Sequence, residues 1–287
     1  MAGRYPRVGG LVFGCLAVLA VGAGFLLGSR QPPDRLVFVS VGQGDCAIFE
    51  SHGHTILIDD GPATPQSDAG KRIVVPELKR LGVDSVDAIL LSHPDEDHVG
   101  GTPALLRDYP GAKVVMSAQF RSDPAMDKHL AKWGLPVARV IWLSETATMK
   151  VGAADLQIEC PPMKPSDPDN NGSMFVHLVD GGGTAAFSGD APISVERFVE
   201  GSGDWRSEIL KAGHHGSRTA SDESWIETVH PTYAVISVGR NNHYGHPNRE
   251  VLDRLTQDGV TILRTDQDGD IEFDYDGKTF IKQPSGG

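Results

Sequence analysis

Short apolar runs, separated by glycine, proline, aspartate and asparagine, follow one another along the chain from Leu36 to Tyr275. Runs of this length between turn residues predict β-strands, and strands dominate the first half of the region. The expected strands are residues 36–41, 46–50, 55–58, 87–92, 113–116, 140–143, 148–151, 155–159, 173–179, 184–188, 208–212, 233–238, 260–264 and 270–275.

Apolar residues at helical spacing lie between many of these strands. The expected helices are residues 74–81, 101–107, 123–133, 193–199, 222–229 and 249–257, with Ser122 or Asp123 capping the third. The chain shows no internal repeat and no second linker, so one domain is expected over residues 36–287. An α/β (α+β) fold of two sheets, covered by helices on their outer faces, satisfies this pattern.

An uncharged stretch, residues 8–28, follows Arg4 and Arg7 and is apolar on every face. A helix of about 20 residues spans a bilayer core, and basic residues before it predict a cytoplasmic N-terminus. We therefore expect residues 1–30 to be a single-pass anchor in the inner (cytoplasmic) membrane, residues 31–35 to be a linker, and the domain to be extracytoplasmic. The alternative is a signal peptide whose cleavage releases a periplasmic or secreted protein.

The overall charge argues against one class of function. The chain has 287 residues, of which 39% are hydrophobic and 22% charged, and its net charge is -12. This balance is typical of a globular protein. Broad electrostatic affinity for DNA needs an excess of basic residues, which is absent, although bound metal ions can hold a phosphodiester locally.

The three cysteines give little chemistry. Cys15 lies in the N-terminal apolar stretch, which leaves Cys46 and Cys160 as the one possible disulfide within the domain. The absence of a C-x-x-C pair argues against a thiolate zinc site. Two partly buried thiols are the favoured interpretation.

A cluster of metal-binding residue types follows the expected strand 87–92. His93, Asp95, Asp97 and His98 lie within six residues, and Gly100-Gly101 follow them. Imidazole nitrogens and carboxylate oxygens are good ligands for zinc, manganese or iron. A loop can direct such side chains to one point, and the glycines remove bulk where the next helix approaches. The alternative is a solvated acidic turn.

This cluster resembles the H-x-H-x-D-H-x-G-G motif of the metallo-β-lactamase superfamily, with Asp95 in place of the second histidine. The variant is similar to the extracytoplasmic hydrolase domain of ComEC-type DNA-uptake proteins. Further matching motifs are V-G-Q-G-D at 41–45, L-I-D-D-G at 57–61, S-G-D at 188–190, H-H-G-S at 214–217 and Y-G-H-P at 244–247. The resemblance covers about residues 36–275.

The resemblance implies an αββα four-layer sandwich with two divalent metal ions. By position, His93 and Asp95 would bind one ion, Asp97 and His98 the other, and Asp190 would bridge them. One histidine of the pair at 214 and 215 would complete the second site, and His214 is favoured. His215 would then donate a proton or contact phosphate, so it is assigned to catalysis together with Asp97. A helix cap is the alternative for Asp190, and a structural role is the alternative for one of the two histidines.

Other residues are expected around the two ions. Asp59 would stay off the metals and orient the ligand loop through hydrogen bonds. His246 would reach the substrate as a third catalytic residue, unless it only supports the loop before Pro247. The usual third histidine of the superfamily is absent, and Asn171 or Asp169 would supply an oxygen instead. Such an oxygen-rich site makes manganese plausible beside zinc.

Two cations about 3.5–4 Å apart can share a hydroxide and stabilise charge in a transition state. The expected function is an extracytoplasmic phosphodiesterase or nuclease that acts on a phosphoester or on single-stranded DNA. The alternatives are hydrolysis of another small ester, such as a lactone or a phosphocholine ester, and a non-catalytic metal-binding module. The membrane is an expected partner through the N-terminal helix, and no obligate protein partner can be deduced.

Overall fold

The computed structural model describes residues 33–164 and 166–284, and two β-sheets form its centre. The first sheet has the order β15 (Phe280–Lys282), β14 (Ile271–Tyr275), β1 (Arg35–Phe38), β2 (Cys46–Ser51), β3 (His54–Asp60), β4 (Ala88–Leu91), β5 (Lys113–Ser117) and β6 (Val140–Leu143). The second has the order β13 (Thr261–Arg264), β12 (Tyr233–Ile236), β11 (Ile209–Lys211), β10 (Gly183–Phe187), β9 (Phe175–Asp180), β8 (Ala154–Glu159) and β7 (Ala147–Val151).

Each sheet combines an antiparallel part with a parallel part. The strands from β3 to β6 are parallel in the first sheet, and those from β10 to β13 are parallel in the second. Helices connect most parallel strands, so their carboxyl ends meet at a common edge of each sheet. That edge is where loops can carry chemistry.

Alternation along β1 shows how the layers arise. Leu36 and Phe38 pack between the two sheets, whereas Val37 and the following Val39 pack against helices on the other face. Successive side chains of a strand point to opposite faces, so an uninterrupted apolar strand must be covered on both sides. β9 shows the same division in the second sheet, where Phe175 faces helices and Val176 faces the first sheet.

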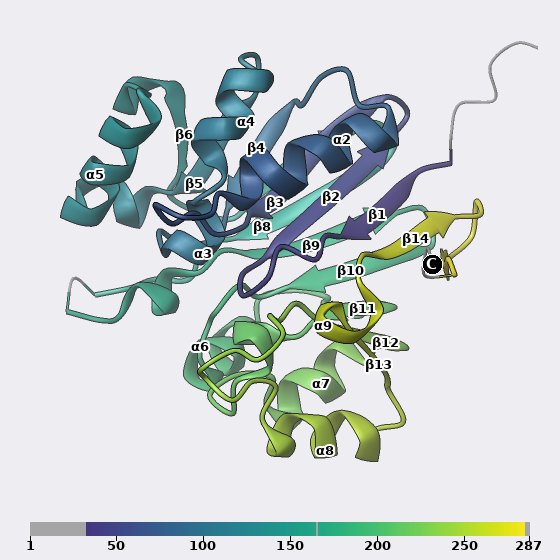
Figure 1. The fold of residues 1–287 in the computed structure, drawn as a ribbon. Helices are drawn as coiled ribbons and strands as arrows, with labels where there is room; N and C mark the ends of the chain where they lie inside the picture. Colours follow the sequence, from purple (N-terminus) through teal and green to yellow (C-terminus); the bar gives the residue numbers. More distant parts are fainter. Residues whose placement is uncertain (1–32, 165, 285–287) are drawn as a thin grey trace, which may run out of the picture. The chain divides into compact units, whose positions relative to one another are not determined.

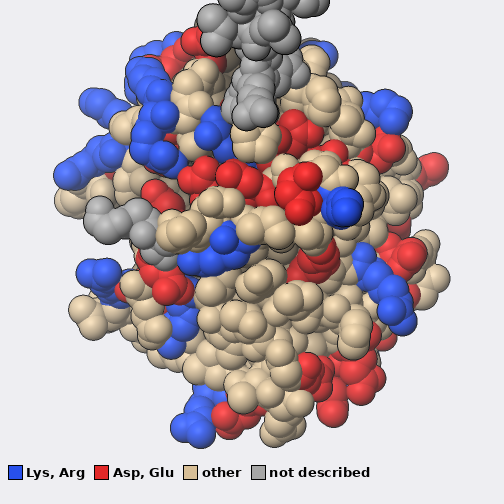
Figure 2. Space-filling model, turned by 90° about the vertical axis from the view of Figure 1, so that its right-hand side faces the viewer, with Lys and Arg blue, Asp and Glu red and all other residues tan. Residues whose placement is uncertain are grey.

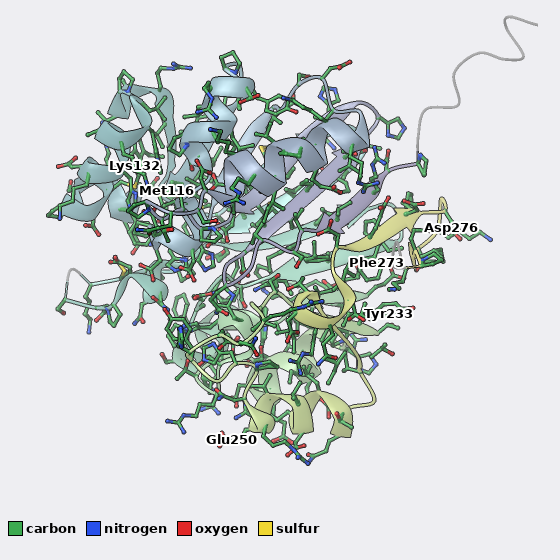
Figure 3. The ribbon with its side chains drawn as sticks, viewed as in Figure 1. Met116, Lys132, Tyr233, Glu250, Phe273 and Asp276 are labelled. Atoms are coloured by element: carbon green, nitrogen blue, oxygen red, sulfur yellow. The ribbon has the colours of Figure 1, made fainter. Side chains whose placement is uncertain are left out.

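Helices cover the outer face of each sheet, as Figure 1 shows. The first sheet carries η1 (Gly70–Val74), α2 (Val75–Leu81), α4 (Thr102–Asp108) and α5 (Pro124–Trp133), and the second carries α6 (Ile193–Val199), α7 (Glu223–Val229) and α8 (Arg249–Gln257). Contacts between the sheets include an edge-to-face pair of Tyr233 on β12 and Phe273 on β14, with ring centroids 5.3 Å apart (Figure 3). The four-layer αββα sandwich is therefore confirmed.

The remaining elements are short and lie mostly at strand ends. They are α3 (Glu96–Val99), η2 (Ala118–Ser122), η3 (Val137–Arg139), η4 (Asp169–Gly172), η5 (Gly213–Gly216) and α9 (Thr265–Asp268). These turns and the edge strand β15 were not predicted. The helix expected from residue 74 begins one turn earlier, at Gly70.

Two expectations about the chain can now be placed. The N-terminal anchor, its alternative as a signal peptide and the first two residues of the linker fall on residues 1–32, outside the described residues. Within the described residues, we find no helix that combines the length and apolar character needed to span a bilayer. Cys46 and Cys160 are both free and buried, as favoured from the sequence.

Candidate metal centre

Three loops from the carboxyl ends of strands bring the expected ligands together. The loop after β4 carries His93 and leads into α3, whose first residues follow Asp95. Asp190 follows β10, and the histidine pair 214–215 lies in η5 after β11. β10 and β11 are parallel neighbours, so their loops leave the same edge of the second sheet. The topology therefore unites residues that are far apart in the sequence.

One group of candidate ligands is buried. His93, His98 and Asp190 are buried, and each offers an atom within 4.8 Å of the others. His98 Nε2 lies 3.3 Å from Asp190 Oδ1, and His93 Nε2 lies 3.4 Å from Asp95 Oδ2. The Asp95 side chain is 47% exposed, so this group opens to solvent on one side.

A second group shares His98 and extends towards η5. Asp97, His98 and His215 each offer an atom within 4.8 Å of the others. His215 Nε2 lies 3.2 Å from Asp97 Oδ2 and 3.7 Å from Asp190 Oδ2. His214 Nε2 lies 3.5 Å from Asp190 Oδ2, but its side chain is 30% exposed. Among the described residues, His215 belongs to the candidate groups and His214 does not, so the geometry favours His215 as the ligand, whereas the sequence favoured His214.

The chemistry of these atoms fits divalent cations. His93 Nε2, His98 Nε2 and Asp190 Oδ1 are buried and have no hydrogen-bond partner among the described residues. Buried polar atoms without partners are costly, so several of them converging on one point indicate a group that they would bind. Imidazole nitrogen and carboxylate oxygen are donors suited to zinc or manganese.

Charges within the centre oppose one another strongly. Burial raises the pKa of Asp190, but the imidazoles of His98 and His215 outweigh this effect and leave that pKa well below its usual range. Burial lowers the pKa of His98, yet Asp190 and Asp59 raise it to well above the ordinary value. For His215, Asp190 and Asp45 outweigh burial and raise the pKa to about 10. Protons therefore compensate the carboxylates, in the position that cations would take.

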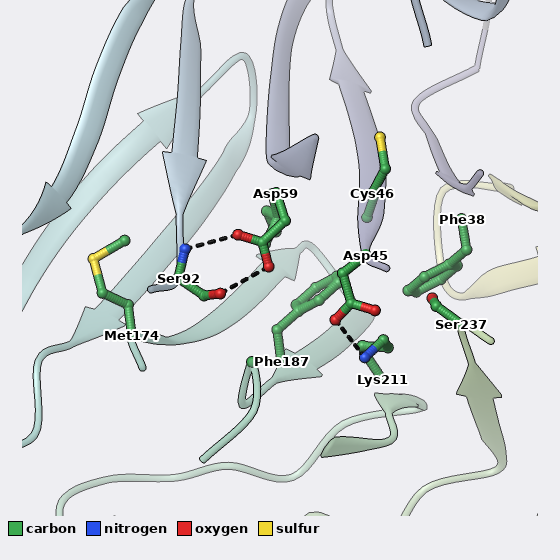
Figure 4. A pocket seen from close by; sticks show the side chains of 12 residues that line it. Phe38, Asp45, Cys46, Asp59, Ser92, Met174, Phe187, Lys211 and Ser237 are labelled. Atoms are coloured by element: carbon green, nitrogen blue, oxygen red, sulfur yellow. Dashed lines mark hydrogen bonds and ion pairs between the residues drawn. The ribbon is translucent and has the colours of Figure 1, made fainter. Parts of the chain in front are cut away.

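Hydrogen bonds and close packing hold the ligand loop in place. Asp59 accepts hydrogen bonds from Ser92 N at 2.7 Å and Ser92 Oγ at 2.8 Å, and its Oδ2 lies 2.8 Å from His98 Nδ1 (Figure 4). This geometry leaves His98 Nε2 free to face the centre, as expected of Asp59. A Cβ on Gly101 would collide with the carbonyl oxygen of Asp60, so the second glycine of the motif permits the approach of α4.

Backbone strain is concentrated at the same place. Asp59, His214 and His215 have positive φ angles of 58°, 48° and 53°. Residues with a Cβ rarely adopt this conformation, and it persists where the surroundings determine it. Here it turns the two consecutive imidazoles in different directions, with their rings 77° apart. One histidine therefore points into the centre while the other faces its open side.

The other expected residues lie at the margin of the centre. The His246 ring lies 5.8 Å from the His214 ring, on the exposed side. Asn171 lies in η4, and no contact of its side chain with the other expected ligands is recorded among the described residues. Asp169 of the same turn is close enough to Asp95 and His93 for both to affect its pKa, which burial and Asp123 raise. Both residues that could supply an oxygen in place of the third histidine therefore lie in η4.

Two residues of the centre were missed as functional residues. Asp45 appeared only as part of the V-G-Q-G-D motif, and Lys211 not at all. Asp45 Oδ1 lies 3.1 Å from His215 Nδ1, and Asp45 Oδ2 lies 2.6 Å from Lys211 Nζ (Figure 4). A lysine inside an otherwise apolar strand was the available signal, because a buried lysine requires a partner.

Comparisons with known proteins agree with this geometry. A profile described as "Metallo-beta-lactamase superfamily" matches residues 39–240. "ComE operon protein 3" of Bacillus subtilis (strain 168) is 30% identical over 267 residues, which cover 86% of this chain and 34% of that protein. "Competence protein ComA" of Neisseria gonorrhoeae is 30% identical over 259 residues, 88% of this chain and 34% of that protein. The chain thus spans about a third of the length of these relatives.

A solved structure supports the fold independently. The metallo-beta-lactamase fold protein YhfI from Bacillus subtilis superposes with a TM-score of 0.54 at 12% identity, covering 80% of this chain and 96% of that one. At this identity the likeness shows the fold alone. The resemblance to ComEC-type proteins is confirmed by these two curated relatives.

Proposed function

This chain belongs to the metallo-beta-lactamase superfamily, and we propose that it is an extracytoplasmic, dinuclear metal-dependent phosphodiesterase of the ComEC-like type. The observation that carries the proposal is the convergence of buried, unpartnered His93, His98 and Asp190 atoms at the edge of the two sheets. Phosphodiester hydrolysis is the reaction class that an oxygen-rich, two-cation centre suits well.

The proposed ligand assignment follows the two groups. His93 and Asp95 would hold one cation together with an oxygen from η4. Asp97, His98 and His215 would hold the other. Asp190 would lie between the two positions, because it forms a close group with His93 and His98 and also one with His215. His215 replaces His214 in this scheme, since its Nε2 is the atom that faces Asp97 and Asp190.

The chain's own residues would perform the remaining steps. When bound, two divalent cations lower the pKa of water and offset negative charge in the transition state. His214 then faces the open side, where burial lowers its pKa and favours the neutral imidazole. A neutral imidazole can accept a proton and then deliver it to a leaving oxygen. His246 lies beside His214 and is placed to contact the substrate.

The choice of substrate rests on the relatives rather than on the surface. One relative is named "Competence protein ComA", which supports single-stranded DNA as a substrate. Acidic and basic side chains are interspersed on the face in Figure 2, and the net charge is -12, so broad attraction of DNA is not a feature of this chain. Contacts would instead be made at the metal centre. Lactones and phosphocholine esters remain the alternative substrates, because fold does not fix substrate.

The test uses the purified full chain in detergent, loaded with manganese or zinc and checked for bound metal by elemental analysis. Bis-p-nitrophenyl phosphate, a single-stranded oligonucleotide, glycerophosphocholine and a set of lactones are compared, with Asp190→Asn as the inactive control. Turnover of the phosphodiesters that Asp190→Asn abolishes supports the proposal. Turnover of lactones alone, or bound metal without any turnover, contradicts it.

A further inference from the structure

Lys211 is the only lysine or arginine that is buried in the described part of the chain. It lies on β11, and its ammonium group donates a hydrogen bond to Ala212 O at 2.9 Å. Its other contact is Asp45 Oδ2, at 2.6 Å. Figure 4 shows this ion pair between Asp45, immediately before β2 of the first sheet, and Lys211 on β11 of the second.

Asp45 contacts two of the residues that are proposed to hold the second cation. Its backbone N–H donates to Asp97 O at 3.2 Å, and its Oδ1 lies 3.1 Å from His215 Nδ1. A Cβ on the preceding Gly44 would collide with Asp97 O, so glycine is required for this approach. The last two residues of the V-G-Q-G-D motif thereby touch two proposed ligands.

The contacts of His215 define which nitrogen carries hydrogen. Nδ1 lies 3.0 Å from the carbonyl oxygen of Ser237, which accepts its hydrogen, and 3.1 Å from Asp45 Oδ1, which faces it as an ion-pair partner. Nδ1 therefore carries hydrogen, and Nε2 is the nitrogen that can bind a cation beside Asp97 and Asp190. Outer carboxylates that fix a ligand histidine in this way commonly tune metal affinity.

We propose that Asp45 and Lys211 form a positioning pair for the second cation. Asp45 orients the His215 ring and the Asp97 backbone, and Lys211 holds the Asp45 carboxylate in place and balances its charge. An unpaired carboxylate at this depth would be unfavourable, so the lysine is what allows Asp45 to remain ionised there. The proposal rests on the metal site of the proposed function and is independent of its substrate.

A purely structural ion pair between the sheets is the competing explanation, and two double variants separate the two. Asp45→Asn with Lys211→Met, and Asp45→Leu with Lys211→Met, both remove the buried charges. The side chains at 45 have similar shapes, but only asparagine keeps a polar oxygen facing His215 Nδ1. The comparison therefore isolates this polar contact and leaves no unpaired buried charge that would prevent folding.

Manganese binding to the full chain is titrated by calorimetry, and urea unfolding is measured in chelator. Of the two manganese ions, one is expected to bind more tightly. The leucine double variant should bind this ion about 10–100-fold more weakly than the asparagine double variant does. Lys211→Met alone should also weaken manganese binding, and Leu78→Ala, which removes a buried side chain of α2, serves as the destabilised control. Equal affinities in the two double variants would overturn the proposal. Wild-type protein that binds manganese normally but hydrolyses nothing would contradict the proposed function and leave this proposal standing.

A second inference concerns Tyr244, which is 70% exposed beside the centre. Its ring stacks on His246 with centroids 5.8 Å apart and an angle of 25°, and His246 in turn contacts His214. The loop is held by the Asn242 side chain, which donates to His246 O at 2.7 Å and accepts from His246 N at 3.0 Å. An exposed aromatic ring is thus held in a fixed loop next to the metal centre.

We infer that Tyr244 is a stacking platform for a nucleobase next to the scissile phosphodiester. The exposed face of a tyrosine suits any base, so single-stranded nucleic acid is the substrate class that uses it best. This inference rests on the proposed phosphodiesterase function. It concerns recognition of the substrate, whereas His214 and the cations concern the reaction.

Tyr244→Ala and Tyr244→Phe are compared on an oligothymidylate and on glycerophosphocholine, which has no ring. Tyr244→Ala should raise KM for the oligonucleotide about 5- to 100-fold, with Tyr244→Phe near wild type and glycerophosphocholine unaffected. Equal effects on both substrates, or none, would overturn the inference. If neither substrate is cleaved, the proposed function fails, and anisotropy with manganese-loaded protein still shows whether Tyr244→Ala weakens oligonucleotide binding.

Discussion

The two halves of the metal centre differ in how firmly their ligands are held. In the half formed by Asp97, His98 and His215, both imidazoles are buried and carry a carboxylate on the nitrogen away from the centre. In the half formed by His93 and Asp95, Asp95 is about half exposed and its contact is with His93 itself. The first arrangement is ready to bind before the cation arrives, and the second must still be completed. We therefore expect a tight site and a weaker, exchangeable one.

The largest effect should come from removing the residue that both halves share. Asp190→Ala takes away an oxygen from each position and leaves His98 and His215 facing each other without the carboxylate between them. We expect loss of both cations and a fall in activity greater than the roughly 10–100-fold typical of changes outside the ligand set. Elemental analysis after dialysis and steady-state assays measure this. One retained cation with full affinity would show that Asp190 does not bridge.

The next prediction separates the halves. Asp97→Ala should abolish the tight site, whereas Asp95→Ala should remove only the weaker cation and leave one tightly bound per chain. Calorimetric titration with manganese gives the number of sites and the affinity of each. The two variants are matched, because each removes one aspartate of the same loop. If Asp95→Ala proves the more damaging to tight binding, the comparison between the halves is reversed.

Protonation of the tight half, formed by Asp97, His98 and His215, predicts that the free energy of unfolding of the metal-free protein depends on pH. Asp190 and Asp45, which outweigh burial, raise the pKa of His215 to about 10, from an ordinary value of 6.5. Below about pH 6.5 this imidazole is protonated in both the folded and the unfolded chain, and its stabilising contribution is complete. That contribution is lost as pH rises towards 10. Free energy of unfolding should therefore fall by up to about 1.4 kcal/mol per pH unit for this proton.

Urea unfolding between pH 7 and 8.5 measures this slope. His98 should add to this slope, because burial lowers its pKa but Asp190 and Asp59 raise it by more. His215→Gln is the control and should flatten the slope. With saturating manganese the sign should reverse, because the cation competes with these protons and binds better at higher pH. A slope that is the same with and without metal would show that protons and cations do not occupy the same place.

The halves also differ in how much of them could be predicted from the sequence. The loop from His93 to His98 was found because its ligands are adjacent in the chain and fall into a known motif. Both sheets and their covering helices were predicted from the apolar patterns, because each strand must be buried on two faces. These features depend on local spacing, which a single sequence shows directly.

The residues that support the tight half are brought together by contacts between distant parts of the sequence. Asp45 and Lys211 lie 166 positions apart in the numbering, on different sheets, and nothing local pairs them. The roles of His214 and His215 could not be separated for a similar reason. Both residues adopt positive φ, and this strained turn decides which imidazole faces Asp97. Side chains beside each other in the sequence can point to opposite sides of a site when the backbone is so constrained.

The smallest effect, at the weaker half, concerns the oxygen that replaces the missing histidine. Asn171 was the expected ligand, and Asp169 the alternative. Burial, Asp123 and Asp95 raise the pKa of Asp169, whereas His93 lowers it, so its carboxyl group lies within the field of the weaker half. A carboxylate crowded by other carboxylates gains more from a nearby cation than an amide does. We therefore expect Asp169→Asn to weaken the second manganese by about 10-fold and Asn171→Ala to have less effect. Calorimetry on the two variants, which alter the same turn, decides between the residues. A larger loss in Asn171→Ala would restore the amide as the ligand and show that η4 turns it towards His93 only when the cation is bound.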